Sequence, residues 1–151
     1  MGGKFETAED LASTIEDLWP AGHQYRYVVL TGGEPLLQVD SALIGALHKL
    51  GFEIAVETNG TIPSPEGIDW LCVSPKAGAL WVQRSGDELK LVYPQNYLDP
   101  KDLGPIDFRH YLLQPMDGPS AKENTQAAIS YCKSNPKWQL SIQTHKILNI
   151  R

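Results

Sequence analysis

Short apolar runs recur along this chain, and almost every one is followed at once by a polar or glycine-containing motif. The runs are rich in β-branched and aromatic residues, which is typical of buried strands. We expect strands at residues 25–30, 53–56, 70–73, 88–93, 109–113 and 139–142. Helix-like segments join several of these runs, an order that favours parallel pairing through right-handed crossovers. The sequence therefore predicts an α/β fold with a mostly parallel, curved sheet in a single domain of residues 1–151.

Helical periodicity and capping residues mark the helices between these runs. The predicted helices cover residues 7–19, 41–50 and 122–135. Thr7 is placed as an N-cap, with Asp10 at capping-box spacing, and Asp40 opens the second helix. Gly51 is positioned to end that helix as a C-cap glycine would, and Pro136 stops the third helix.

The pair Gly86-Asp87 is typical of a tight local turn. We therefore expect residues 81–83 to pair antiparallel with residues 88–93, as a local exception in the parallel sheet.

Composition excludes several classes of function. The formal net charge is −5 and the basic residues are scattered, which argues against a nucleic-acid surface. No apolar run approaches the roughly 20 residues of a membrane span, and the start has no signal-peptide pattern, so we expect a cytoplasmic protein. The two cysteines, Cys72 and Cys132, lack metal-ligand spacing, and Cys72 sits in an apolar run that suits a core position.

The motifs that follow the expected strands carry the polar chemistry. They are Thr31-Gly32-Gly33-Glu34-Pro35, Glu57-Thr58-Asn59-Gly60, Ser74-Pro75-Lys76, Gln114-Pro115-Met116-Asp117 and Gln143-Thr144-His145-Lys146. In parallel sheets and barrels the carboxyl ends of the strands lie at one rim, and ligands bind there. The sequence therefore predicts one binding site built from successive strand ends.

The motif after the first strand is the most specific of these. Gly32 and Gly33 let the backbone approach a ligand without obstruction by Cβ, so that its carbonyls and amides can bond a small polar group. Pro35 then fixes the exit of the turn. The motif is not a phosphate loop, because no Lys-Ser or Lys-Thr pair follows it.

Thr31–Pro35 after a strand resembles the radical S-adenosylmethionine (SAM) motif whose backbone receives the methionyl amino group of SAM. Further segments narrow the resemblance to the 7-carboxy-7-deazaguanine synthase family of queuosine biosynthesis, a tRNA modification pathway. The resemblance to this family extends from Gly2 to the last residue. These segments are Glu57–Thr61, Val73–Gly78, Glu88–Pro94, Leu113–Pro119 and Gln143–Lys146. The resemblance implies a partial TIM-like barrel, as in radical SAM enzymes.

The resemblance also assigns site residues. SAM is then held by Gly33, Ser74, Pro75, Lys76, Gln114, Pro115, Met116 and Asp117. The pterin substrate is held by Thr31 and by the terminal residue, Arg151. Gly32, Glu34 and Asn59 are further candidates at the same rim. Glu57 and Asn59 are candidates to contact the ribose hydroxyls or the substrate, with helix capping or hydrogen bonding within a turn as the alternative. Glu57 is also a catalytic candidate, and His145 is either a catalytic candidate or a structural histidine.

The implied activity is a carbon–nitrogen lyase reaction. It contracts the ring of 6-carboxy-5,6,7,8-tetrahydropterin to 7-carboxy-7-deazaguanine with loss of ammonia, using SAM, a 4Fe–4S cluster and Mg²⁺. The resemblance further implies a homodimer and an external electron donor. A cluster is held by cysteine thiolates, and the family's Cys-x3-Cys-x2-Cys-type loop, which precedes the matching region, is missing here. We therefore expect the ligands of the cluster and of Mg²⁺ to be absent, and this chain alone to be inactive.

Two alternatives stay open from the sequence. One is a non-catalytic SAM- or pterin-binding remnant without a cluster. The other is a cluster-independent barrel enzyme that uses Glu34, Lys76 and His145 in acid–base roles.

Overall fold

The computed structural model describes residues 3–150 and is built on one six-stranded sheet. The strands are β1 (Tyr27–Leu30), β2 (Glu53–Thr58), β3 (Trp70–Val73), β4 (Ser85–Tyr93), β5 (Asp107–Pro115) and β6 (Trp138–Leu140). The helices are α1 (Ala8–Leu18), the 3₁₀ helix η1 (Pro35–Leu37), α2 (Ser41–Lys49), α3 (Ala121–Ser134) and α4 (Thr144–Leu148). The strands lie in chain order, and every neighbouring pair is parallel.

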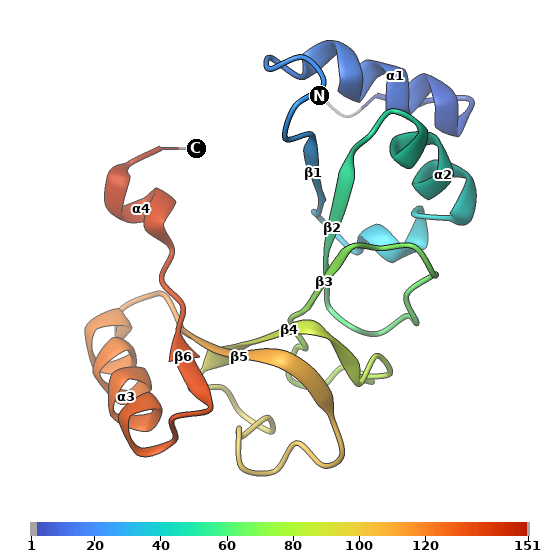
Figure 1. Ribbon diagram of the computed structural model, residues 1–151. Helices are drawn as coiled ribbons and strands as arrows, with labels where there is room; N and C mark the ends of the chain where they lie inside the picture. The colour runs from blue at the N-terminus through green and yellow to red at the C-terminus, as the bar shows by residue number, and fades with distance from the viewer. Residues whose placement is uncertain (1–2, 151) are drawn as a thin grey trace.

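The sheet curves into an open arc, as Figure 1 shows. The longer helices α1, α2 and α3 lie on its outer, convex side, and α4 continues from β6 at the far end of the arc. Within residues 3–150, β1 and β6 are the two edges and do not pair with each other. The predicted α/β class is confirmed, with the sheet of an incomplete barrel.

The helix ends follow the capping residues that the sequence indicated. Thr7 is the N-cap of α1, and its hydroxyl accepts a hydrogen bond from the amide of Asp10 at 3.1 Å. Asp40 caps α2 through a bond of 2.9 Å from the amide of Leu43. Gly51 follows the end of α2 with φ of +78°, the left-handed conformation that a C-terminal glycine allows.

The expected antiparallel pairing at Gly86-Asp87 is wrong. The two residues lie inside β4, and residues 81–83 are not in a strand. A Cβ on Gly86 would lie 3.1 Å from the carbonyl oxygen of Leu71, so this glycine permits close packing of β4 on β3. Asp87 accepts a hydrogen bond from the amide of Leu71 at 2.9 Å. A glycine-aspartate pair can thus serve strand contact as well as a turn.

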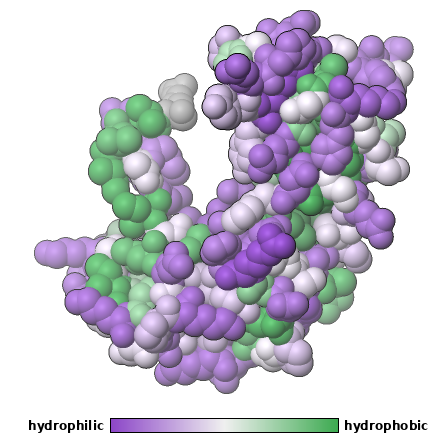
Figure 2. Space-filling view, viewed as in Figure 1, coloured by the Kyte–Doolittle hydropathy of each residue, from purple (hydrophilic) through white to green (hydrophobic). Residues whose placement is uncertain are grey.

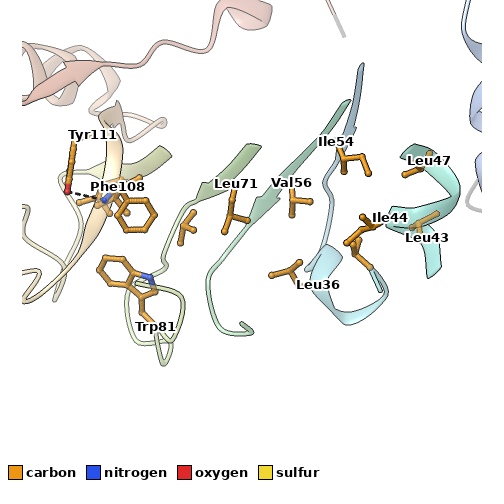
Figure 3. Packing of buried hydrophobic residues seen from close by; sticks show 14 of the residues in the cluster. Leu36, Leu43, Ile44, Leu47, Ile54, Val56, Leu71, Trp81, Phe108 and Tyr111 are labelled. Carbon is orange, nitrogen blue, oxygen red and sulfur yellow. Dashed lines mark hydrogen bonds between the residues drawn. The ribbon is translucent and has the colours of Figure 1, made fainter. Parts of the chain in front are cut away.

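The hydrophobic core lies between the sheet and the helices. Alternate residues of the central strands, including Ile54, Val56, Leu89 and Leu91, are fully buried. Figure 3 shows Ile54 and Val56 on the same side of the sheet as Leu36 of η1 and the apolar side of α2, with the aromatic residues around β5 at the other end of the cluster. This alternation directs the remaining side chains of each strand to the inner, concave face.

The concave face is open, and Figure 2 shows it as a deep hollow between the α1 end and the α4 end of the molecule. Apolar side chains are exposed around α4, including Ile142, Ile147 and Leu148. No helix among the described residues is long and apolar enough to cross a membrane.

Candidate functional site

A polar cavity lies where the carboxyl ends of the strands converge on the concave side. Its volume is about 330 Å³. The lining residues are Thr31, Gly32, Gly33, Glu57, Thr58, Asn59, Ser74, Lys76, Lys90, Val92, Gln114 and Gln143. They come from the ends of β1, β2, β3, β4 and β5 and from the segment after β6. Segments far apart in the sequence therefore form one wall, as expected for the ligand edge of a parallel sheet.

The glycine pair after β1 leaves its part of the wall open. Gly32 and Gly33 have φ of +89° and +57°, values that residues with a Cβ rarely adopt. A Cβ added at either position would meet no heavy atom within 4 Å. The space above this backbone is therefore available to a ligand, which can approach its amides and carbonyls directly.

The carboxylate of Glu34 makes hydrogen bonds that support the walls of the cavity. Its carboxylate accepts hydrogen bonds from the amide of Leu36 at 3.0 Å, from the hydroxyl of Thr58 at 2.7 Å and from the amide of Asn59 at 2.8 Å. These bonds join the tip of β1 to the tip of β2. Glu34 does not line the cavity itself, but it holds two segments that do.

A charged pair lies on the cavity wall between β2 and β4. Lys90 donates to Oε1 of Glu57 over 3.0 Å. Nearby on the same face, the buried thiol of Cys72 donates to Glu88 over 3.1 Å. Burial is the main reason that the pKa of Cys72 lies far above that of an ordinary thiol, so the free thiol of this buried residue is neutral.

A second lysine, Lys76 in the segment after β3, also lines the cavity. Lys76 donates to the hydroxyl of Ser74 over 2.9 Å. Burial of its amine and the positive charge of Lys90 lower the pKa of Lys76 below its ordinary value. Lys76 thus adds a second amine to the side of the cavity that contains the Lys90–Glu57 ion pair.

A more apolar pocket of about 260 Å³ adjoins the polar cavity, and the two share Gln114 and Gln143. Its walls include Pro115, Met116, Ile142 and Ile147, with the side chains of Asp117 and Lys146 at its border. Asp117 and Lys146 form an ion pair between the end of β5 and α4. The hydrogen bond from Lys146 lowers the pKa of Asp117.

The cavity and the pocket bring together most of the residues that the sequence singled out, with exceptions. Pro75 is buried and does not line the cavity. His145 is exposed on α4 and lines neither the cavity nor the pocket. Arg151 lies outside the described residues.

Sequence reasoning did not single out Lys90 and Val92 as site residues, although they line the cavity; Gln143, which also lines it, belongs to a predicted strand-end motif but had no role assigned. A signal for Lys90 was present: it is a lysine within the apolar run Leu89-Lys90-Leu91-Val92, where a charged residue requires a partner. Val92 carries no comparable signal.

The described residues do not suit an iron–sulfur cluster. No group of three or more His, Cys, Asp or Glu side chains in residues 3–150 could hold a metal ion. The two cysteines are a buried residue of β3 and a partly buried residue of α3. They cannot supply the thiolates that hold such a cluster.

Known proteins resemble this chain over nearly its whole length. It is 59% identical over 149 residues to 7-carboxy-7-deazaguanine synthase of Caulobacter vibrioides, covering 99% of this chain and 71% of that protein. It is 59% identical over 151 residues to the protein of the same name from Bradyrhizobium diazoefficiens, covering 100% of this chain and 72% of that protein.

The fold is also found in a crystal structure of QueE from Escherichia coli, with a TM-score of 0.60 and 27% identity. The similarity covers 90% of this chain and 63% of the Escherichia coli chain. No family model matches the sequence. Taken together with the strand-end cavity, the identity to these synthases shows that the chain belongs to the 7-carboxy-7-deazaguanine synthase family.

Proposed function

We propose that this chain forms the SAM- and pterin-binding part of a radical SAM 7-carboxy-7-deazaguanine synthase. The reaction is the ring contraction of 6-carboxy-5,6,7,8-tetrahydropterin with loss of ammonia, a step of queuosine biosynthesis. The observation that carries the proposal is the single cavity that joins Gly33, Lys76 and Gln114 from three strand ends. Cavities of a few hundred Å³ with convergent polar groups are the usual form of small-molecule sites.

The parts of the site match the parts of SAM. The open backbone at Gly32 and Gly33 suits the methionyl amino group, and Lys76 suits its carboxylate. The neighbouring apolar pocket at Pro115 and Met116 suits the flat adenine base. When bound, SAM supplies the hydrogen-abstracting chemistry of a radical SAM enzyme, and the residues of this chain bind and orient it.

The pterin is assigned to the polar side of the same cavity. Thr31 lies at the tip of β1, where its hydroxyl can bond the polar ring atoms of a pterin. Glu57 and Asn59 at the tip of β2 add acceptors and a donor beside it. In this proposal both ligands lie against strand ends, the position at which parallel sheets bind substrates.

A second candidate function is a SAM- or pterin-binding protein that does not turn over substrate. This alternative is considered because residues 3–150 contain two free cysteines, Cys72 in β3 and Cys132 in α3, which are fewer than a cluster requires. We therefore assign no step of the reaction to a cluster held by the described residues. An assay with iron, sulfide, reductant, SAM and the tetrahydropterin separates the two: formation of 7-carboxy-7-deazaguanine by these 151 residues would contradict the non-catalytic alternative.

The glycine pair provides a sharp binding test with a matched control. Gly33 and Gly22 have nearly the same φ, +57° and +62°, and neither would place a Cβ within 4 Å of another atom. Only Gly33 lines the cavity, whereas Gly22 precedes the amino end of β1. Both Gly33→Ala and Gly22→Ala should lower the free energy of unfolding by a similar amount, about 1–2 kcal/mol.

SAM affinity should distinguish the two variants in isothermal titration calorimetry. We expect the wild-type chain and Gly22→Ala to bind SAM alike, and Gly33→Ala to bind it at least about tenfold more weakly, a loss of about 1.4 kcal/mol. Equal affinities of the two variants, or no heat from the wild-type chain at millimolar SAM, would contradict the proposed site.

A further inference from the structure

Lys90 is an unusual residue for its place in the fold. It lies in β4, near the middle of the sheet, between the fully buried residues Leu89 and Leu91. Its own side chain is 17% exposed and points to the concave face, where it lines the polar cavity. Buried strands favour apolar residues, so a lysine is unexpected at this position. Residues that depart from such local preferences are concentrated at functional sites.

The surroundings keep Lys90 charged. Burial by itself would lower the pKa of this lysine, but the hydrogen bond to Glu57 and the negative charges of Glu57 and Glu88 act in the opposite direction, and the pKa is raised. The amine therefore remains an ammonium group and a hydrogen-bond donor at neutral pH.

Glu57 is the partner that receives this charge. Its side chain is 46% exposed at the tip of β2, and Oε1 accepts the bond of 3.0 Å from Lys90. Within residues 3–150 its other oxygen, Oε2, accepts no hydrogen bond. The carboxylate is thus held at one oxygen by β4, while the second oxygen belongs to a side chain that lines the cavity.

We propose that Lys90 is a positioning residue, which fixes the Glu57 carboxylate so that Oε2 accepts a hydrogen bond from a donor of the bound ligand. The inference rests on the proposed function, which supplies the ligand. The donor is either a ribose hydroxyl of SAM, the group that acidic residues commonly bind in nucleotide sites, or the N–H edge of the pterin. A long glutamate side chain held by a charged partner loses less rotamer freedom on binding than an unpaired one.

The test is a double-mutant cycle read by calorimetric titration, with SAM in one arm and 6-carboxy-5,6,7,8-tetrahydropterin in the other. We expect Lys90→Met and Glu57→Ala each to lower the affinity for one of these ligands about tenfold or more, because a charged hydrogen bond is lost. Lys90→Met should cause no further loss when Glu57 is already alanine, since it acts through that carboxylate. The arm in which the loss appears identifies the donor.

Two control variants separate positioning from general effects. Lys90→Arg keeps the charge and donors and should restore affinity to within about threefold of the wild-type chain. Lys101→Met removes a lysine from an exposed loop and should leave affinity unchanged. Thermal melting of each variant shows whether the change in affinity is accompanied by a loss of folding.

The outcomes are distinct. If Lys90→Met weakens binding equally in the wild-type and Glu57→Ala backgrounds, Lys90 contacts the ligand directly and the positioning role is overturned. If it weakens neither ligand, the inference also fails while the proposed function stands. A wild-type chain that binds neither ligand overturns both.

A measurement on the wild-type chain keeps the inference testable if Lys90→Met does not fold. The through-hydrogen-bond NMR coupling between Nζ of Lys90 and the Glu57 carboxylate should persist when the ligand is added. Its disappearance on ligand binding would overturn the positioning role.

Discussion

Individual carboxylates in this molecule divide between scaffold and cavity. Glu34 and Glu57 both lie next to strand ends, and the sequence alone does not distinguish their roles. Glu34 uses both carboxylate oxygens for internal hydrogen bonds, whereas Glu57 is held at only one oxygen and faces the cavity. The partners of a carboxylate, which depend on tertiary contacts, decide whether it stabilises the site or is available to a ligand.

Removal of Glu34 should therefore lower stability. Glu34→Ala leaves the donors of Leu36, Thr58 and Asn59 without their acceptor, and we expect it to reduce the free energy of unfolding by about 1–3 kcal/mol in urea denaturation. Glu66→Ala removes an exposed carboxylate and should change stability by less than about 0.5 kcal/mol. Equal effects of the two substitutions would contradict the scaffold role.

At the scale of elements, side chains between strands tie the start of the sheet to its helices. Asp69 comes directly before β3 and accepts hydrogen bonds from the amide of Ile54 at 2.8 Å and from the ring of His48 at 2.9 Å. One carboxylate thus links the amino ends of β2 and β3 to the last turn of α2. Burial acts to raise the pKa of Asp69, but the bonds from His48 and Ile54 outweigh it and lower the pKa.

This lowered pKa predicts a pH dependence. An aspartate whose pKa is lower in the folded state adds stability above its unfolded pKa, about 3.9, and loses it as pH falls through the folded value. The difference in unfolding free energy between wild type and Asp69→Asn should shrink as the pH falls below about pH 4. Since the side chains of His48 and Asp69 are each 39% exposed, we expect this difference in unfolding free energy to be less than about 1 kcal/mol.

Urea denaturation of both proteins from pH 2 to pH 5 measures this difference. A difference that grows as the pH falls would contradict the assignment.

On the scale of the whole molecule, the sheet is open and its two ends differ in environment from its middle. Leu89, Leu91 and Leu113 in β4 and β5 are fully buried, whereas Tyr27 and Val29 of β1 are partly exposed on the concave side. Among residues 3–150, no strand pairs with the outer edge of β1. Local stability should therefore fall from the centre of the arc towards its edges.

Hydrogen exchange followed by NMR measures this gradient. Amides of Leu89 and Leu91 should exchange slowest, close to the rate of global unfolding, and the amides of β1 that point away from β2 should exchange fastest among the strands. Strong protection along the outer edge of β1 would contradict the open arc and show that another segment or a second copy covers that edge.

Much of this architecture could be predicted without coordinates. The positions of β2 to β5, the caps at Thr7 and Asp40 and the parallel order all follow from local periodicity and capping chemistry. Local reasoning was wrong at Gly86, where the close approach of Leu71 decides the conformation, and it did not predict the five-residue helix α4. It also began the first strand at Tyr25, which adopts a left-handed φ of +54°.

The sequence by itself determined which residues stand at strand ends, because a run of buried residues and the motif after it are adjacent in the chain. Only the tertiary structure decided which of them share a cavity: Gly33, Lys76 and Gln114 do, while His145 does not. It also revealed Lys90, whose partner Glu57 lies on another strand. The physical reason is that periodicity reports the direction of a side chain within its own strand, whereas the pairing of charges and the shape of a cavity depend on curvature across several strands.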